Sequence, residues 1–524
     1  MSRYISRARL TGIAVAAGLA SLAPASADAT QATAPFIVNS YQPGAQWFEG
    51  VATGYNGDTA TIWSDAARSG YHYLRRFDGT GGAIDGADWY AGTGRFAQVA
   101  VDGIGDFAII RATDGSATLN DNVTLTVYNR SGVAVTSPIR VNATANGVFG
   151  TTMRVAMNRS GEIVVAWMEA ITGGTGIVKA RVYTRAGAAL TGELNISPGG
   201  ARVFSLGQVA VADDGAFAAV FVEPDYVNNR GIVVFEKFSK DGVPFTNPQQ
   251  ASTSTTADQN WPTLAMNGQG SAVVAWGFGE PTNRYYIGVH AQRFGISGNK
   301  SGAEFAVVNQ TSVGPNAAVS SVSAGMTESG TFSLAFNTWD DVTNPGLTPK
   351  LQLREYDGAA MAAGGPFVFP APSGFGWYGL TQMTSSPAGI LTLADGASSL
   401  TDGSNIDVGA LRYTTDNQAA VTTLTSGATV ANQSTVTGKW IYYRILVPNA
   451  TSQLTLSTVG ANGNADLYGR VGALPTINNA EVKNTAPGST QSIVINSPPP
   501  GLFYIGVYAA AGFSGLSVTA TATH

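Results

Sequence analysis

Short apolar stretches separated by polar turns recur along this chain, and the same order of stretches repeats seven times between residues 43 and 424. Each copy has an apolar stretch, a tight turn with glycine, a second apolar stretch that ends in an aromatic residue in most copies, a variable loop and a third stretch that ends in an aromatic residue. A weaker fourth stretch follows, as in SPIRVN at 137–142. Apolar runs this short, bounded by turn residues, predict β-strands. The repeat therefore predicts a unit of four antiparallel strands.

The third and fifth copies show the repeat most clearly. The third reads VAMNRSGEIVVAW at 155–167, and the fifth reads LAMNGQGSAVVAW at 264–276. Glycine supplies the positive φ that hairpin turns need. The turn glycines of the seven copies are Gly57, Gly105, Gly161, Gly215, Gly270, Gly330 and Gly389. A four-stranded repeat of this length is typical of a propeller blade, so we expect an all-β fold with a seven-bladed β-propeller at residues 34–425. An eight-bladed ring, or six blades with a stray repeat, is the alternative.

The ends of such a ring must be joined, and two segments compete for that role. The stretch APFIVNS at 34–40 resembles the fourth strands of the repeats, which predicts that an N-terminal strand pairs into the last blade and covers its open edge. The last copy also has a fourth-strand candidate of its own, AAVTTLT at 419–425. The sequence leaves open which of the two closes the ring.

A different module follows the repeats. Residues 426–435, SGATVANQST, are typical of a linker, and in residues 436–524 alternating apolar positions bounded by Gly and Pro predict short antiparallel strands. Residues 438–523 resemble the bacterial pre-peptidase C-terminal domain. The residues that carry the resemblance are Trp440, Tyr442 and Tyr443 before Val447-Pro448, the segment NADLY at 464–468, and YIGV at 504–507. The resemblance implies a small C-terminal β-sandwich of a kind found at the ends of secreted bacterial proteins, often peptidases.

Composition restricts location and partners. Residues 1–27 have three arginines, then an apolar stretch, then Ala-Ser-Ala, which predicts a secretory signal peptide. No later segment is apolar enough to predict a membrane span, so we expect an exported protein, and we expect it to be a monomer. Without the signal the formal net charge moves from −5 to −8, because three arginines and no acids are removed. That charge argues against nucleic acid as a partner. The chain has no cysteine, which excludes disulfides and thiolate metal sites.

The candidate site lies in the variable loops, because a carboxylate stands at or just beyond the end of every second strand. If the tight turns share one face, these loops and the connections between blades share the other. Acids and aromatic rings suit an extracellular glycan or a protein ligand, and we predict non-catalytic binding. The predicted ligand-binding residues are Asp65, Glu169, Glu223, Asp225, Glu280, Trp339, Asp340, Asp341 and Trp377.

Four other functions are alternatives to binding. A glycoside hydrolase needs two of these acids about 5–10 Å apart. A polysaccharide lyase would need cationic groups for its substrate, and a purely structural scaffold needs neither. Peptidase chemistry has no support, because the three histidines form no HExxH motif and no GxSxG nucleophile motif is present. We therefore assign no catalytic residue.

No cofactor is predicted from the sequence. A Ca²⁺ loop is an alternative at Asp102–Asp106, but the equivalent turns of other copies read NRSGE and NGQGS, so a hairpin turn accounts for it better. Asn464 and Asp466 in the C-terminal module are a second alternative for Ca²⁺.

Overall fold

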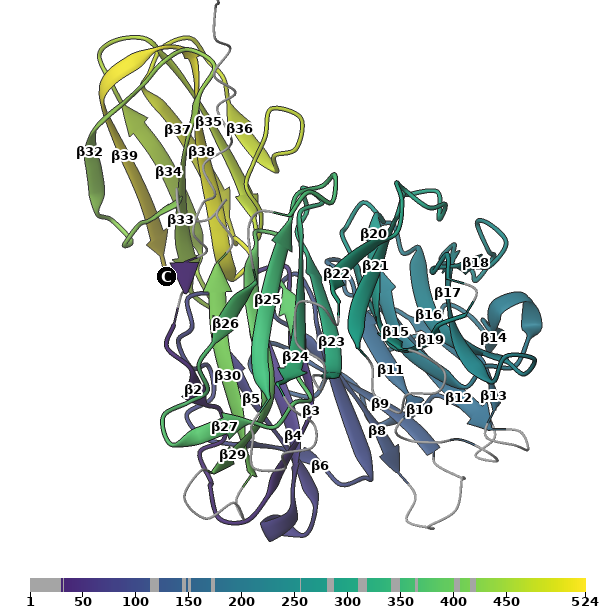
Figure 1. Cartoon of the computed structure of the whole chain (residues 1–524). Coiled ribbons are helices and arrows are strands. Elements are labelled where there is room, and N and C mark those ends of the chain that lie inside the picture. The colour runs from purple at the N-terminus through teal and green to yellow at the C-terminus, as the bar shows by residue number, and fades with distance from the viewer. Residues whose placement is uncertain are drawn as a thin grey trace, which may run out of the picture.

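The fold is described from a computed structural model. It describes residues 30–31, 33–113, 122–143, 148, 152–170, 175–254, 256–279, 287–309, 318–340, 349–362, 366–399, 406–414 and 421–524. The chain forms seven antiparallel sheets that follow one another around an axis, and a two-sheet sandwich that stands above them at the left of Figure 1. The expected seven-bladed propeller with a C-terminal sandwich is confirmed. Within the described residues, no helix is long and apolar enough to cross a membrane.

Blades 1 to 3 each use four consecutive strands. Blade 1 contains β3 (Gln46–Thr53), β4 (Thr59–Asp65), β5 (Tyr71–Phe77) and β6 (Trp89–Gly92), with the 3-10 helix η1 (Ala66–Arg68) after β4. Blade 2 contains β7 (Phe96–Val101), β8 (Phe107–Thr113), β9 (Asn122–Tyr128) and β10 (Ile139–Arg140). Blade 3 contains β11 (Arg154–Met157), β12 (Ile163–Ala170), β13 (Gly176–Tyr183) and β14 (Leu194–Asn195), followed by η3 (Pro198–Gly200).

Blades 4 to 6 follow the same order. Blade 4 contains β15 (Ser205–Val211), β16 (Phe217–Asp225), β17 (Arg230–Phe238) and β18 (Gln249–Gln250). Blade 5 contains β19 (Asp258–Met266), β20 (Ala272–Gly279), β21 (Gly288–Phe294) and β22 (Phe305–Val308). Blade 6 contains β23 (Ala318–Met326), β24 (Phe332–Trp339), β25 (Lys350–Tyr356) and β26 (Phe367–Phe369).

Blade 7 combines the two ends of the propeller. It contains β28 (Gln382–Ser385), β29 (Ile390–Ser399) and β30 (Ile406–Thr414), and β27 (Phe375–Trp377) also pairs with β29. The outer place beside β30 is taken by β2 (Phe36–Ile37) and β1 (Thr30–Gln31). The N-terminal strand therefore closes the ring.

The two residues that follow β2, Val38 and Asn39, make the same hydrogen bonds as the residues that follow the fourth strands of other blades. Asn39 Oδ1 accepts the amide of Val408 at 2.8 Å, just as Asn142 Oδ1 accepts the amide of Val123 in blade 2 at 2.8 Å. Arg75 donates to the carbonyl of Val38 at 2.8 Å, and Arg181 donates to that of Val141 at 2.9 Å. The resemblance of residues 34–40 to the fourth strands thus has a physical basis in shared hydrogen bonds.

The core lies between adjacent blades. Trp63, Trp167 and Trp276, which end their second strands in the repeat, are fully buried there. Burying a large side chain of this kind contributes roughly 1.5–3 kcal/mol. The turn glycines also behave as predicted: all seven have positive φ, from 83° at Gly215 to 92° at Gly389. The repeat therefore encodes the packing and the turns together.

The assignment of residues 426–435 as a linker was wrong, and the second candidate for the closing strand belongs to the sandwich. In that candidate segment β31 (Val421–Thr423) pairs parallel with β33 (Trp440–Val447) of the sandwich. The predicted linker contains β32 (Thr429–Thr435), which pairs with β39 (Phe513–Thr523). Because β32 is an edge strand with little burial, its polar composition resembles that of a linker.

Two sheets form the sandwich, in the orders β31-β33-β38-β35-β36 and β32-β39-β34-β37. The remaining strands are β34 (Gln453–Val459), β35 (Asn464–Val471), β36 (Val482–Asn484), β37 (Gln491–Asn496) and β38 (Gly501–Ala511). Tyr443, Leu456 and Ile505 are among the residues that fill the core between the sheets. The alternating apolar positions of the sequence are the inward ones.

Candidate functional site

The central feature of the propeller is a cavity of about 860 Å³ along its axis, lined by the first strands of all seven blades. We call the face with the tight turns the turn face and the opposite face, where the first strands begin, the loop face. The cavity reaches both: Trp261 lines it near the start of β19, and Asp213 lines it in the turn after β15. Apolar residues such as Val51 and Val99 share the lining with uncharged amide and hydroxyl side chains, namely Gln98, Gln208, Ser321, Ser323, Thr381, Gln382 and Thr384.

Bulges interrupt four of these first strands at the loop-face end. The register shifts around Glu49, Gly207, Trp261-Pro262 and Ser320, and all of these residues line the cavity. A bulge turns an extra residue out of the strand's alternation and often aims a side chain at a site. Trp261 has φ of 49°, a conformation that a bulky residue adopts only at a cost of about 1–3 kcal/mol. The strain is local to the channel mouth.

Exposed aromatic rings stand at this end of the channel. Trp261 is 43% exposed. Trp47, also 43% exposed, precedes the bulge of β3 and meets Tyr378 edge to face, with 6.0 Å between the ring centroids. Trp261 lines the cavity, and Trp47 and Tyr378 lie within two residues of the lining residues Phe48 and Leu380. Exposed apolar rings next to a cavity indicate a binding surface. We call Trp261, Trp47 and Tyr378 the mouth aromatics.

Two charged side chains lie in the channel near the loop face, and both have protein partners. Glu49 accepts the amide of Ala97 at 3.0 Å, and its Oε2 is 2.9 Å from Nδ1 of the fully buried His72. Arg154 donates to the carbonyls of Gly207 and Met153, and burial lowers the pKa of this guanidinium to about 10. His72 lies within β5.

None of the seven predicted ligand residues that the structure describes lines this cavity. Asp65 is fully buried and caps η1, where it accepts the amides of Ala67 and Arg68 and pairs with the Arg68 guanidinium at 2.6 Å. Arg68 in turn lies 3.5 Å from the ring centroid of Tyr73 and 2.8 Å from Asp88. Asp65 therefore positions an arginine and is not a free carboxylate, which corrects its assignment.

Three other predicted acids at the ends of the second strands form ion pairs with cations close to them in the sequence. Glu169 pairs with Lys179 at 3.0 Å. Asp225 pairs with Arg230 at 2.8 Å, and hydrogen bonds from Asn228 and Arg230 lower its pKa to about 2. Asp340 pairs with Lys350 and is exposed. In each pair a nearby lysine or arginine already neutralises the carboxylate that was predicted to bind ligand.

Glu223 differs, because burial raises its pKa and it lies on the same sheet as Glu236. Burial and the charge of Glu223 raise the pKa of Glu236 to about 7. Both side chains belong to blade 4 and not to the channel lining. The predicted convergence of acids on the axis is therefore not observed among the described residues.

The two aromatic residues that were predicted to bind ligand, Trp377 and Trp339, are less exposed than the mouth aromatics. Trp377 is 3% exposed and packs in the core between blades 6 and 7, where its Nε1 donates to the carbonyl of Phe369. That assignment was wrong, and the adjacent Tyr378 carries the exposed ring instead. Trp339 ends β24 and is half-buried. Glu280 and Asp341 lie outside the described residues.

Charged side chains gather at the turn-face end of the channel. Asp213 and Glu328 both approach Gly268, with oxygens 2.6 and 3.0 Å from where its Cβ would stand. Burial and the charge of Glu328 raise the pKa of Asp213, and Arg159 and Arg470 oppose that rise. Arg470 belongs to the sandwich, so this end of the channel involves both domains.

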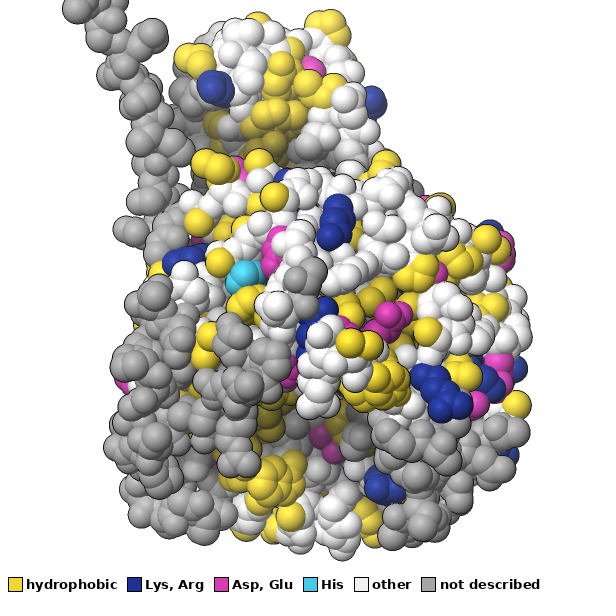
Figure 2. All heavy atoms as spheres, turned by 45° about the vertical axis from the view of Figure 1, so that its right-hand side comes forward, with side chains coloured by type: hydrophobic (Ala, Val, Ile, Leu, Met, Phe, Trp, Pro, Cys, Tyr) yellow, Lys and Arg dark blue, Asp and Glu magenta, His cyan; other side chains and the backbone are white. Residues whose placement is uncertain are grey.

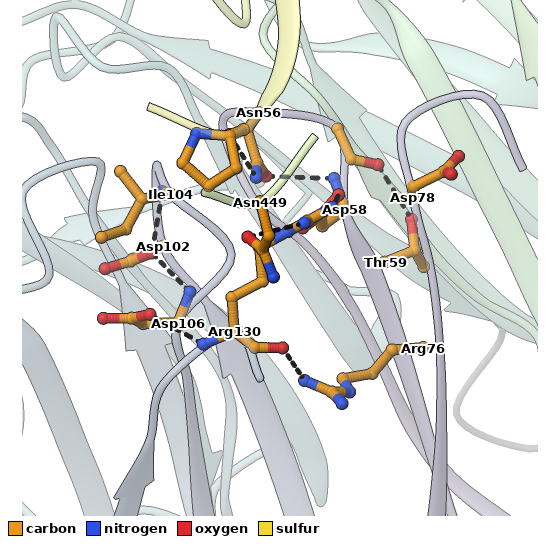
Figure 3. Close-up of polar contacts among 12 residues, drawn as sticks. Asn56, Asp58, Thr59, Arg76, Asp78, Asp102, Ile104, Asp106, Arg130 and Asn449 are labelled. Atoms are coloured by element: carbon orange, nitrogen blue, oxygen red, sulfur yellow. Dashed lines mark hydrogen bonds and ion pairs between the residues drawn. The ribbon is translucent and has the colours of Figure 1, made fainter. Parts of the chain in front are cut away.

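The turn face also carries the alternative Ca²⁺ loop, drawn in Figure 3. Asp102 Oδ1 accepts the amides of Ile104 and Asp106, both at 2.9 Å, and Asp102 Oδ2 lies 2.7 Å from Arg185. Nearby, Arg130 bridges Asp58 of blade 1 and Asn449 of the sandwich. The loop is a hairpin turn held by an arginine. Across the described residues, no three His, Asp or Glu side chains are grouped as metal ligands.

Comparison with known proteins identifies the second module. Residues 441–509 match the model of the bacterial pre-peptidase C-terminal domain, and the sandwich is such a domain. Alkaline serine exoprotease A of Vibrio alginolyticus is 32% identical over 97 residues, which is 18% of this chain and 18% of that protein.

The propeller has similar solved structures at low identity. A protein of unknown function from Dyadobacter fermentans is 11% identical with a TM-score of 0.43, over 74% of this chain and 99% of that one. The β-propeller domain of the Trilobed protease from Pyrococcus furiosus is 8% identical with a TM-score of 0.41, over 71% of this chain and 94% of that one. These similarities concern the fold alone.

The channel lining was missed by the sequence reasoning, although a signal for it exists. Three of the first strands carry a glutamine, namely Gln98 in FAQVAV, Gln208 in SLGQVAV and Gln382 in QMTS. A polar residue in an otherwise buried strand indicates contact with water or ligand. Aligning the first strands would have pointed to the axis.

Proposed function

We propose that this is an exported bacterial protein that binds a neutral glycan at the loop-face mouth of the propeller channel, without catalysing its cleavage. The observation that carries the proposal is a channel whose lining includes amide and hydroxyl side chains, together with the exposed ring of Trp261 in that lining. The C-terminal module supports export, because such domains are typical of secreted bacterial proteins.

The chemistry of the lining favours a neutral polyhydroxyl ligand. Amides and hydroxyls both donate and accept hydrogen bonds, as sugar hydroxyls do. Flat rings offer large, rigid contact surfaces that pack on the apolar faces of sugar rings. The side of the molecule seen in Figure 2 carries charged side chains of both signs among hydrophobic and neutral ones.

Hydrolysis has less support than binding. A hydrolase needs an acid and a second carboxylate on opposite sides of the bond. The carboxylates among the channel-lining residues are Glu49 near the loop face, and Asp213 and Glu328 at the opposite end. Glu49 already pairs with His72 and accepts the amide of Ala97. The groups that remain at the mouth to contact a ligand are therefore aromatic rings and neutral side chains.

A glycan array of plant and microbial oligosaccharides tests the proposal, using the chain without its signal segment. We expect a defined set of neutral oligosaccharides to bind, and Trp261→Ala to weaken that binding by about tenfold or more, because stacked rings contribute roughly 1–3 kcal/mol each. Tyr226→Ala is the matched control, since Tyr226 is an aromatic residue that is 73% exposed and does not line the channel. Equal effects of the two changes, or no binding across the array, would contradict the proposal.

A further inference from the structure

We infer that the C-terminal sandwich is docked across the turn-face end of the channel and closes it, so that the channel has a single entrance on the loop face. The contact that closes it is made by residues 470–481, from the end of β35 to just before β36. We call this segment, with its propeller partners Tyr55, Arg159 and Glu328, the turn-face latch.

Arg470 is the first member of the latch. Its side chain is 4% exposed and lies 3.6 Å from Glu328, in the turn after β23 of blade 6. It also lies over the ring of Tyr55, in the turn after β3 of blade 1, at 5.7 Å from the ring centroid. A charge this deeply buried is stable only beside an opposite charge. The arginine is therefore held against the channel wall.

Glu481 is the second member. It forms an ion pair with Arg159, in the turn after β11 of blade 3. Arg159 also stacks on Tyr55, with 4.5 Å to the ring centroid, so the tyrosine ring contacts both arginines. The two ends of the latch segment are thus joined through a single ring at the channel wall.

The positions of these blades show that the segment crosses the axis. Blades 3 and 6 are three apart in a ring of seven, which is the largest separation that such a ring allows. Tyr55, Arg159 and Glu328 all line the channel. A segment that contacts blades 1, 3 and 6 at lining residues must therefore lie over the opening between them.

Close backbone contact fixes the segment in place. Gly472 has φ of 68°, and a Cβ there would lie 1.9 Å from the carbonyl oxygen of Tyr55, so only glycine permits this approach. Leu502 donates its amide to the carbonyl of Asn56 at 2.9 Å, and its side chain packs against Gly57 and Gly79. Leu502 and Tyr504 form one buried cluster with Ile390 of blade 7. Burying this apolar surface stabilises the docked position.

The chain has no cysteine, so single introduced cysteines report access cleanly. Asp213→Cys places a thiol at the turn-face end of the channel, and Ser320→Cys places one at the loop-face mouth. Each thiol is labelled with a small maleimide and with a bulky polyethylene glycol maleimide. Labelling is repeated with Arg470→Ala/Glu481→Ala in the background, and with Lys483→Ala as the matched control, because Lys483 is exposed on β36.

We expect the bulky reagent to label Asp213→Cys about tenfold more slowly than Ser320→Cys, and the small reagent to label both. The double variant should raise bulky labelling at Asp213→Cys to the rate at the mouth, and Lys483→Ala should not. Fast bulky labelling of Asp213→Cys in the otherwise intact chain would overturn the inference. So would unchanged slow labelling in the double variant when circular dichroism shows both domains folded. No glycan is used, so this outcome is independent of the proposed function.

Discussion

Asn39 holds the closing strand of the propeller, and replacing it should weaken the ring in a pH-dependent way. Its side chain is 3% exposed. It donates to Asp407 at 2.6 Å and to the carbonyl of Tyr41 at 2.9 Å, and it accepts the amide of Val408 at 2.8 Å. Asn39→Ala therefore leaves a buried carboxylate and a buried amide without these partners.

The magnitude follows from these lost partners. A buried group left without its hydrogen bond costs about 1–3 kcal/mol, and more when it is charged, so we expect a loss of about 3 kcal/mol at pH 8. Burial raises the pKa of Asp407, and the hydrogen bond from Asn39 opposes that rise. Without Asn39 the folded-state pKa of Asp407 rises further, so the ionised form is penalised at high pH and relieved by protonation at low pH. The loss should therefore be smaller at pH 5 than at pH 8.

The matched control is Asn142→Ala in blade 2. Asn142 accepts the amide of Val123 at 2.8 Å in the equivalent place, is 1% exposed, and serves an internal blade. We expect a loss of about 1 kcal/mol that does not change between pH 5 and pH 8. Scanning calorimetry of both variants at the two pH values measures the difference. Equal losses with no pH dependence in either variant would refute the account of ring closure.

Two further predictions concern single residues. Burial and Glu223 raise the pKa of Glu236 to about 7, so the protonated form stabilises the fold below the unfolded pKa and that stability is lost as pH rises through about 7. Glu236→Gln should raise the free energy of unfolding by about 1–3 kcal/mol at pH 8 and change it little at pH 5, which the melting temperature measured against pH will show. A lower melting temperature of the variant at pH 8 would show that the carboxylate is stabilising. Trp377→Ala should cost about 3–5 kcal/mol in a denaturant titration because it opens a cavity between blades 6 and 7, yet leave glycan affinity unchanged, and a lost affinity in folded protein would return Trp377 to the site.

The propeller could be predicted because its signals are local. A tight turn needs positive φ, and a glycine there, as at Gly57 or Gly270, is visible without any tertiary structure. The closing strand could be narrowed to two candidates in the same way, because residues 34–40 and residues 419–425 both resemble a fourth strand. Seven copies of one local pattern reinforce each other.

The site could not be predicted because it depends on strand register, on which side chains pair, and on the closed ring. Whether Trp377 or Tyr378 faces solvent depends on strand register, and a shift of one residue exchanges the two faces. Acids at strand ends read alike in sequence, but Glu169 and Asp340 are satisfied by Lys179 and Lys350 across a hairpin. The channel is formed by seven strands whose shared axis appears only once the ring is closed.

Blocking the mouth of the channel tests the central claim most directly. Ser320 lines the cavity at a bulge near the loop face, whereas Ser329 is exposed in a tight turn of the same blade on the turn face. Each is replaced by cysteine, and affinity for the oligosaccharide that binds best on the array is measured before and after labelling with a bulky maleimide. The account predicts that labelling at Ser320→Cys abolishes binding and that labelling at Ser329→Cys leaves it unchanged. Full affinity after complete labelling at Ser320→Cys would contradict it.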